Sequence, residues 1–413
     1  MQTRKVIYLI LLLSAAAVSV QGLDVGFTLN SVTGARQGSE PGIGFSHADT
    51  VSFWGVRARG QSPIGYRWRV WYRYNLDRPV AFELDELYMT ARLEGESAVT
   101  ALRVGRFTHR DWGRVVFNHG QDGVRATLSG NAVDMRLYAG TTALVAGHRS
   151  TIFLSPLDSQ NRDALFGSPR LISSAALRLP SLLAGITPTI EALGQFELRS
   201  GDVAYHSQYV TLDIDSSVGG GFSLGTTGSV MAMQIEQEDS ESLDLRLGYL
   251  GRIDMRYVRP ALSGLSLLLR GWYASGEQSD GQEIGDFSVG AFRPVSMLRV
   301  TSVLPVQIDG TFGGRVQASL RPFSGESPIW LQDTQVSLYG VPLFRTSEQS
   351  QLITQVDEDS SNLYMGSEIG TSLAMRPASD FGLRIGGGVF IAGDALIDDS
   401  IRWQASADLS FSF

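Results

Sequence analysis

Arginines alternate with apolar residues in one stretch of the chain, and guanidinium groups are well suited to attract an anion. Within residues 64–75, Arg67, Arg69 and Arg73 occupy one parity, whereas tyrosine, tryptophan and valine occupy the other. Side chains alternate between the two faces of a β-strand, so this spacing predicts guanidiniums on one face and aromatic rings on the opposite face. Extending the parity to neighbouring stretches predicts a wall of arginines: Arg57, Arg59, Arg67, Arg69, Arg73, Arg92, Arg103, Arg125 and Arg136.

Such a wall suits a membrane protein only if it faces water. An arginine that faces hydrocarbon costs roughly 2–4 kcal/mol at the midplane of a transmembrane β-barrel. We therefore expect the arginines to line an aqueous lumen and the aromatic rings to face lipid. Charged walls set the selectivity of water-filled pores, so the arginines predict attraction of anions. The alternative is that each arginine pairs with an acid such as Glu86 or Asp134 and only hydrates the wall.

The last thirteen residues indicate which kind of sheet holds these arginines. From Ile401 to Phe413, every odd position is apolar and every even position is polar or charged. Strands in soluble proteins usually run to about 5–6 residues, whereas a strand tilted across a bilayer needs about 9–11. The stretch resembles the C-terminal strand of bacterial outer-membrane β-barrels. The resemblance implies that the barrel-assembly machinery reads a signal made by Leu409, Phe411 and Phe413.

Similar alternating runs recur along the chain and predict an all-β fold. We expect a transmembrane antiparallel up-and-down β-barrel of about eighteen strands, in which short periplasmic turns alternate with longer outer loops. Long outer connections are expected at 32–49, 143–169, 276–309 and 345–362. Within 204–237 we expect a glycine-rich kink at Gly219–Gly221 and a turn near Gly225–Gly228. Another division of this region would give about sixteen strands.

The connection at residues 107–121 holds a second group of charged and aromatic residues. Leu102-Arg103-Val104-Gly105-Arg106-Phe107 leads into it, and Asp122-Gly123-Val124-Arg125 follows it. These flanks resemble the Val-Gly-Arg and Asp-Gly-Val pattern of porin-like and alginate-export-like barrels. In porins, this outer loop folds into the barrel and narrows it, so the resemblance implies a constriction made by Arg110, Asp111, Trp112 and Arg114. The alternative is an ordinary outer loop with a solvated charge cluster.

The N-terminus has the pattern of a secretory signal peptide over residues 1–22. Two basic residues precede a short apolar run and a group of small residues. We expect cleavage after Gly22, with Ala17 and Ser19 as the second choice of flanking residues. Residues 23–413 then form a single barrel domain in the bacterial outer membrane.

The composition argues against several other classes of protein. The chain has no cysteine, which excludes disulfides and cysteine-based metal sites. Its five histidines lack a zinc-binding spacing, and a net charge of −8 argues against a nucleic-acid partner. We therefore expect no enzymatic activity, no cofactor and no metal.

These observations together predict a porin-like channel for passive diffusion of small hydrophilic solutes, anions among them. Membrane lipid and the assembly machinery would be its other partners, and the barrel could work alone or as an oligomer. The alternative is a non-conducting barrel whose long outer loops act in adhesion or envelope structure. A third hypothesis, transport of apolar substrates, rests on the apolar stretch from Thr151 to Leu154.

Overall fold

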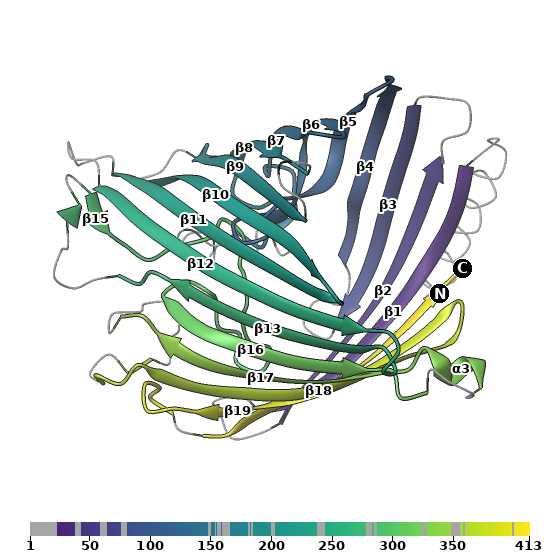
Figure 1. Cartoon of the computed structure of the whole chain (residues 1–413), viewed down its shortest axis with the longest axis vertical. Coiled ribbons are helices and arrows are strands. Elements are labelled where there is room, and N and C mark those ends of the chain that lie inside the picture. The colour runs from purple at the N-terminus through teal and green to yellow at the C-terminus, as the bar shows by residue number, and fades with distance from the viewer. Residues whose placement is uncertain are drawn as a thin grey trace.

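A computed structural model describes most of the chain as one closed sheet (Figure 1). The described residues are 23–37, 43–57, 64–75, 81–147, 150–152, 154, 158, 166–180, 182, 185–199, 203–237, 244–277, 283–284, 287–323, 328–347, 356–357, 360–398 and 400–413. The expected signal peptide at 1–22 and Arg59 lie outside these residues.

Eighteen long strands form the wall of the barrel in this part of the chain. Their bounds are β1 (Leu23–Gln37), β2 (Ile43–Arg57), β3 (Ile64–Asn75), β4 (Ala81–Glu94), β5 (Ala98–Arg110), β6 (Asn118–Gly130), β7 (Asp134–Thr141), β8 (Arg170–Arg178), β9 (Ile186–Glu197), β10 (Val203–Gly219), β11 (Phe222–Gln237), β12 (Asp244–Arg259), β13 (Leu265–Ala274), β16 (Thr311–Leu320), β17 (Gln335–Arg345), β18 (Tyr364–Ala378), β19 (Phe381–Ala392) and β20 (Arg402–Ser412). Each pairs antiparallel with the next along the wall, and β1 also pairs with β20, which closes the barrel. The prediction of an eighteen-stranded antiparallel barrel is confirmed.

Three short elements lie outside this wall. The strands β14 (Glu283–Ile284) and β15 (Phe287–Val289) form a small hairpin, and β15 also pairs with β12. The helix α3 (Ile329–Gln332) lies in the connection between β16 and β17. Among the described helices, none has the length and apolarity needed to cross a membrane.

Three expectations about connections are corrected by the strand pairing and the backbone angles. The stretch 32–49 is not a long loop, because β1 and β2 stay paired through most of it, as far as Gln37 opposite Ile43. The three glycines Gly219–Gly221 are a tight turn and not a kink within a strand. All three have positive φ angles, of 90°, 60° and 88°. Glycine adopts this left-handed region without steric cost, so the chain reverses there. The expected turn near Gly225–Gly228 is part of β11.

The outward face of the barrel carries the apolar side chains that a bilayer requires. Leu87, Met89, Val104 and Leu137 are 54%, 50%, 42% and 51% exposed. Near the outer ends of the strands, five rings stack across β12 to β18 with centroid separations of 4.7–6.4 Å: Tyr249, Tyr273, Phe312, Phe344 and Tyr364. Aromatic girdles of this kind mark the two interfaces of a transmembrane barrel. The exposed apolar wall and the girdle identify the barrel as membrane-spanning.

The seam between the two chain ends is closed by aromatic packing as well as by hydrogen bonds. The backbone N–H of Phe413 donates to the carbonyl of Phe27 at 2.9 Å, and the N–H of Phe27 donates to Phe413 at 3.0 Å. The ring of Phe27 lies 5.9 Å from Phe413 and 6.4 Å from Phe411. The C-terminal residue therefore takes part in closing the barrel.

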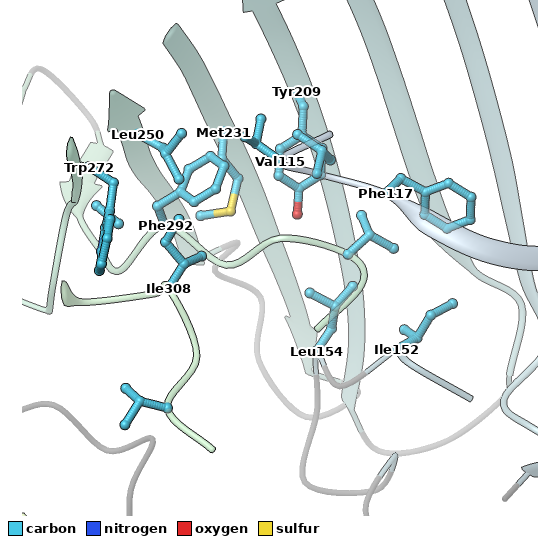
Figure 2. Packing of buried hydrophobic residues seen from close by; sticks show 14 of the residues in the cluster. Val115, Phe117, Ile152, Leu154, Tyr209, Met231, Leu250, Trp272, Phe292 and Ile308 are labelled. Atoms are coloured by element: carbon cyan, nitrogen blue, oxygen red, sulfur yellow. The ribbon is translucent and has the colours of Figure 1, made fainter. Parts of the chain in front are cut away.

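The interior of the barrel contains an apolar cluster built partly from connections between strands (Figure 2). Inward side chains of the wall, such as Tyr209, Met231 and Trp272, pack against residues of three connections. The connection residues in the cluster include Val115, Val116, Phe117, Ile152, Leu154, Phe292, Val295, Leu304, Val306 and Ile308. These connections fold into the lumen, and they determine what the remaining interior offers to a solute.

Candidate functional site

Most of the arginines singled out in the sequence lie on the inward face of the wall. In the β2–β3 register, Trp54 lies opposite Arg69, and Val56 lies opposite Arg67. Trp68, between Arg67 and Arg69, points to the opposite face, because it lies opposite the exposed Leu87 of β4. Directly opposed residues of antiparallel strands point to the same face. Arg67 and Arg69, and Arg73 by the same parity, therefore point inward, away from the lipid-facing side chains.

Arg57 departs from the expected arrangement. It lies opposite Tyr66 on the outward face, with its guanidinium carbon 5.9 Å from the centre of the Tyr66 ring. The expectation for Arg57 requires the apolar residue Trp54, which has the opposite parity, to face lipid, whereas Trp54 points inward. Trp54 fits there because it lies against Gly26 of β1, where a Cβ would come within 2.5 Å of the indole. The glycine leaves room for an aromatic ring on the lumen wall, and this reverses the parity of β2.

Several inward arginines are paired with carboxylates. Arg67 Nε lies 2.6 Å from Glu86 Oε2, and Arg69 Nη1 lies 3.3 Å from Asp85 Oδ2. Arg92 contacts Glu94 at 3.1 Å. For these residues, part of the positive charge is neutralised within the wall.

Arg136 is more buried than these three arginines, with a side chain that is 12% exposed. Its Nη2 donates to Glu191 of β9 at 2.9 and 3.1 Å. The side chain of Glu191 is only 2% exposed. The ion pair therefore belongs to the packed interior as much as to a water-filled surface.

Arg103 and Arg125 form a different arrangement. They lie directly opposite each other on β5 and β6, both on the inward face. Among the described residues, no carboxylate lies within 4.0 Å of either guanidinium. Arg103 lies over the ring of Tyr88 at 4.2 Å, and both guanidiniums lie over the ring of Phe107, at 5.6 and 5.1 Å. The ring faces partly stabilise these cations, while two like charges remain side by side.

The connection between β5 and β6 is shorter than expected and consists of residues 111–117. The side chain of Asp111, which is 3% exposed, holds this loop in its conformation. The carboxylate accepts hydrogen bonds from the backbone N–H groups of Val115, Val116 and Phe117 at 3.0, 3.4 and 2.7 Å. Burial raises the pKa of Asp111, although these hydrogen bonds oppose the shift. The loop is therefore a compact turn built around one carboxylate.

This loop makes contacts with five strands beyond β5 and β6. The N–H of Trp112 donates to Glu191 of β9 at 2.6 Å. Arg252 of β12 donates to the carbonyl of Gly113 at 2.9 Å. A Cβ on Gly113 would lie 3.0 Å from the methyl groups of Thr211 and Thr227, on β10 and β11. The Trp112 ring also lies 4.5 Å from the guanidinium carbon of Arg136. The loop lies inside the barrel.

The four residues expected at the constriction occupy different environments. Asp111 and Trp112 belong to the inward contacts just described. Arg110 is exposed at the end of β5, where it donates to Asn118 at 3.2 Å. Arg114 is exposed and has a φ of 56°, a left-handed conformation that is uncommon outside glycine.

Sequence reasoning missed a second inward segment, residues 290–310, which it assigned to an outer connection. The N–H of Ser296 donates to the carbonyl of Val116 at 3.0 Å, and the N–H of Met297 donates to Thr151 at 2.7 Å. The three connections are therefore hydrogen-bonded to one another inside the barrel. The apolar residues Val303, Leu304, Val306 and Ile308 could have indicated this, because a solvated outer loop has no need for them.

In the part of the chain that the structure describes, no three histidine, aspartate or glutamate side chains gather closely enough to hold a metal ion.

Comparisons with known proteins agree with the geometry of the barrel. No protein-family model matches the chain, and no curated protein matches it. Among solved structures, Pseudomonas aeruginosa OccK5 (OpdH) has a TM-score of 0.60 at 12% identity, covering 95% of this chain and 98% of that one. OccK2 (OpdF) of the same organism, in complex with glucuronate, has the same values. OprD of that organism has a TM-score of 0.55 at 12% identity, covering 95% and 96%. The chain thus has the fold of these outer-membrane porins over nearly its whole length.

Proposed function

We propose that the protein is a channel of the bacterial outer membrane for passive diffusion of small hydrophilic solutes, with a preference for anions. The membrane-spanning barrel, the inward arginines and the connections folded into the lumen support this proposal. Bilayer lipid would cover the outward face. The barrel-assembly machinery would read the C-terminal strand through Leu409, Phe411 and Phe413.

The observation that carries the anion preference is the pair Arg103 and Arg125. Two guanidiniums on adjacent strands repel each other, and a carboxylate placed between them would remove that repulsion. Guanidiniums bind carboxylates through parallel N–H···O bonds, which suits a solute acid better than a neutral sugar. The neighbouring Phe107 and Tyr88 rings hold both side chains against the wall. The pair is thus positioned to receive an anion without first giving up a protein carboxylate.

One solved neighbour is described in complex with glucuronate, a sugar acid. That ligand belongs to the neighbour. Its chemistry, one carboxylate on a hydroxylated ring, matches what the Arg103–Arg125 pair and the polar lumen wall would favour here. We therefore propose small organic acids as the preferred solutes.

Conductance in a planar bilayer with a salt gradient across it tests the proposal. We expect stable current steps with a reversal potential on the anion-selective side. Replacing both arginines (Arg103→Gln with Arg125→Gln) should move that potential toward zero while steps persist. The Arg57→Gln variant is the matched control, because Arg57 lies on the outward face. A wild-type barrel that folds and carries no current would refute the channel.

The alternative function, adhesion or envelope structure through long outer loops, finds less support. Within the long connection expected at 276–309, the residues from 290 onward are directed into the barrel and not toward the outside. The apolar stretch from Thr151 to Leu154 also has a structural role, since Ile152 and Leu154 are each 2% exposed within the interior cluster. It offers no support for transport of apolar substrates.

A further inference from the structure

We propose that Glu368 of β18 is a positioning residue that anchors the inward segment 290–310 and so sets the width of the lumen. This inference rests on the proposed channel function. It concerns a side chain that no charge pattern in the sequence distinguishes.

The side chain of Glu368 is fully buried, and its carboxylate receives the tip of the inward segment. The backbone N–H of Ser302 lies 3.1 and 2.8 Å from the two carboxylate oxygens, and the N–H of Val303 lies 2.8 Å from Oε2. The hydroxyl of Tyr339 on β17 donates to Oε1 at 2.9 Å. Glu368 is 0% exposed. The two successive N–H groups of the segment and one hydroxyl of the wall therefore supply the donors of a buried carboxylate.

Glycines of the wall make this docking possible. A Cβ on Gly370 would lie 2.3 Å from the ring of Tyr339, so the tyrosine lies flat over the position where a side chain would stand. A Cβ on Gly388 of β19 would lie 3.1 Å from Val303 Cγ2 and 3.4 Å from the Tyr339 hydroxyl oxygen. The segment tip and the tyrosine thus share a shallow surface that only glycine leaves free.

The anchor also supports a charged group of the lumen. The guanidinium carbon of Arg315 on β16 lies 4.4 Å from the centre of the Tyr339 ring. Tyr339 is held in turn by its hydrogen bond to Glu368. One carboxylate therefore fixes both the tip of the segment and the ring on which an inward arginine rests.

The docked and the released segment differ in what satisfies the Glu368 carboxylate. When the tip leaves, the carboxylate exchanges two protein donors for lumen water, and hydrogen bonds to a charged group remain net favourable after that exchange. The docked state is favoured for that reason. Replacing the carboxylate by an amide leaves a neutral acceptor in place of a charged one for the two backbone N–H groups, so the docked state loses part of its advantage. Losing the charge from an acceptor of two N–H groups shifts such an equilibrium by about tenfold.

The experiment compares the wild type with Glu368→Gln in two assays. The first is swelling of proteoliposomes in neutral sugars of increasing size, which reports width independently of charge. The second is maleimide labelling of Val303→Cys, since the chain has no cysteine of its own. We expect Glu368→Gln to admit larger sugars and to label about tenfold faster. The matched control is Glu236→Gln, the same change at a carboxylate that is 57% exposed on β11.

A second variant tests the anchor without a substitution in the barrel wall, in case Glu368→Gln prevents the wall from folding. Ser302→Pro removes one donor from the segment and leaves Glu368 in place, and it should shift both assays in the same direction. Unchanged labelling in both variants overturns the inference. Faster labelling with an unchanged sugar limit also overturns it, because the segment would then not set the width. Faster labelling with no sugar entering through any variant supports the anchor and refutes the proposed channel, so the two failures are distinguishable.

Discussion

Replacing Asp111 by asparagine tests whether one carboxylate keeps the loop 111–117 inside the barrel. The carboxylate accepts three backbone N–H groups, the shortest of them from Phe117 at 2.7 Å. An asparagine keeps one acceptor oxygen and turns an NH₂ group toward the remaining donors. Hydrogen bonds to a charged group contribute about 1.5–3 kcal/mol each. Burial of the carboxylate offsets part of this gain, as the raised pKa of Asp111 indicates. A net loss of about 2 kcal/mol is therefore reasonable, and it corresponds to a factor of about 30 in the docking equilibrium.

Limited trypsin digestion of the folded barrel measures this equilibrium. Arg114 is the exposed basic residue at the tip of the loop, and trypsin can cut after it only when the loop leaves its docked conformation. Cleavage should become about 30-fold faster in Asp111→Asn if the opening equilibrium limits the rate. The control is Asp380→Asn, in an exposed turn at the other end of the barrel. Equal cleavage rates in Asp111→Asn and the wild type would refute the role assigned to Asp111.

Two further predictions concern buried charge. Burial raises the pKa of Asp309, in the inward segment, from 3.8 to about 7. The docked segment therefore holds a proton that a released segment gives up. The contribution of Asp309 to docking should be fully present below pH ~4 and fall by at most about 4 kcal/mol as the pH rises to ~7. Conductance between pH ~5 and ~8 should depend on pH in the wild type and much less in Asp309→Asn, and identical profiles would contradict this. Arg170 is fully buried against Asp158 at 2.8 Å and Glu197 at 3.7 Å. Arg170→Met leaves both acids without it and should destabilise the barrel by about 3–5 kcal/mol, read as a lower unfolding temperature in detergent. An unchanged temperature would show that the network adds nothing to stability.

The wall of the barrel could be predicted from the sequence because transmembrane strands repeat a two-residue pattern. The stretch 401–413 and the observed β20 (Arg402–Ser412) agree within a residue at each end. The glycines made the strand prediction less accurate, because glycine has two different structural roles in this barrel. At Gly219–Gly221 it provides a turn through positive φ, whereas Gly26 makes room for an inward tryptophan. A single sequence shows the glycines but not which of these roles they have.

The inward connections were harder to predict, because their partners lie far away in the sequence. Trp112 is held by Glu191, and Ser302 by Glu368. No spacing of nearby residues in the sequence indicates such contacts. The parity rule did place Arg103 and Arg125 on the inward face, and Arg67 and Arg69 as well. It could not say that two of these arginines have carboxylate partners while the other two do not.

The most direct test of the central claim is the entry of two matched solutes into proteoliposomes, glucuronate and glucose. They share ring and size and differ in a carboxylate. We expect glucuronate to enter faster than glucose through the wild type, and the difference to shrink when Arg103 and Arg125 are both replaced by glutamine. Equal entry of the two solutes through the wild type would leave a porin without the anion preference. Entry of neither through a folded barrel would contradict the proposed channel itself.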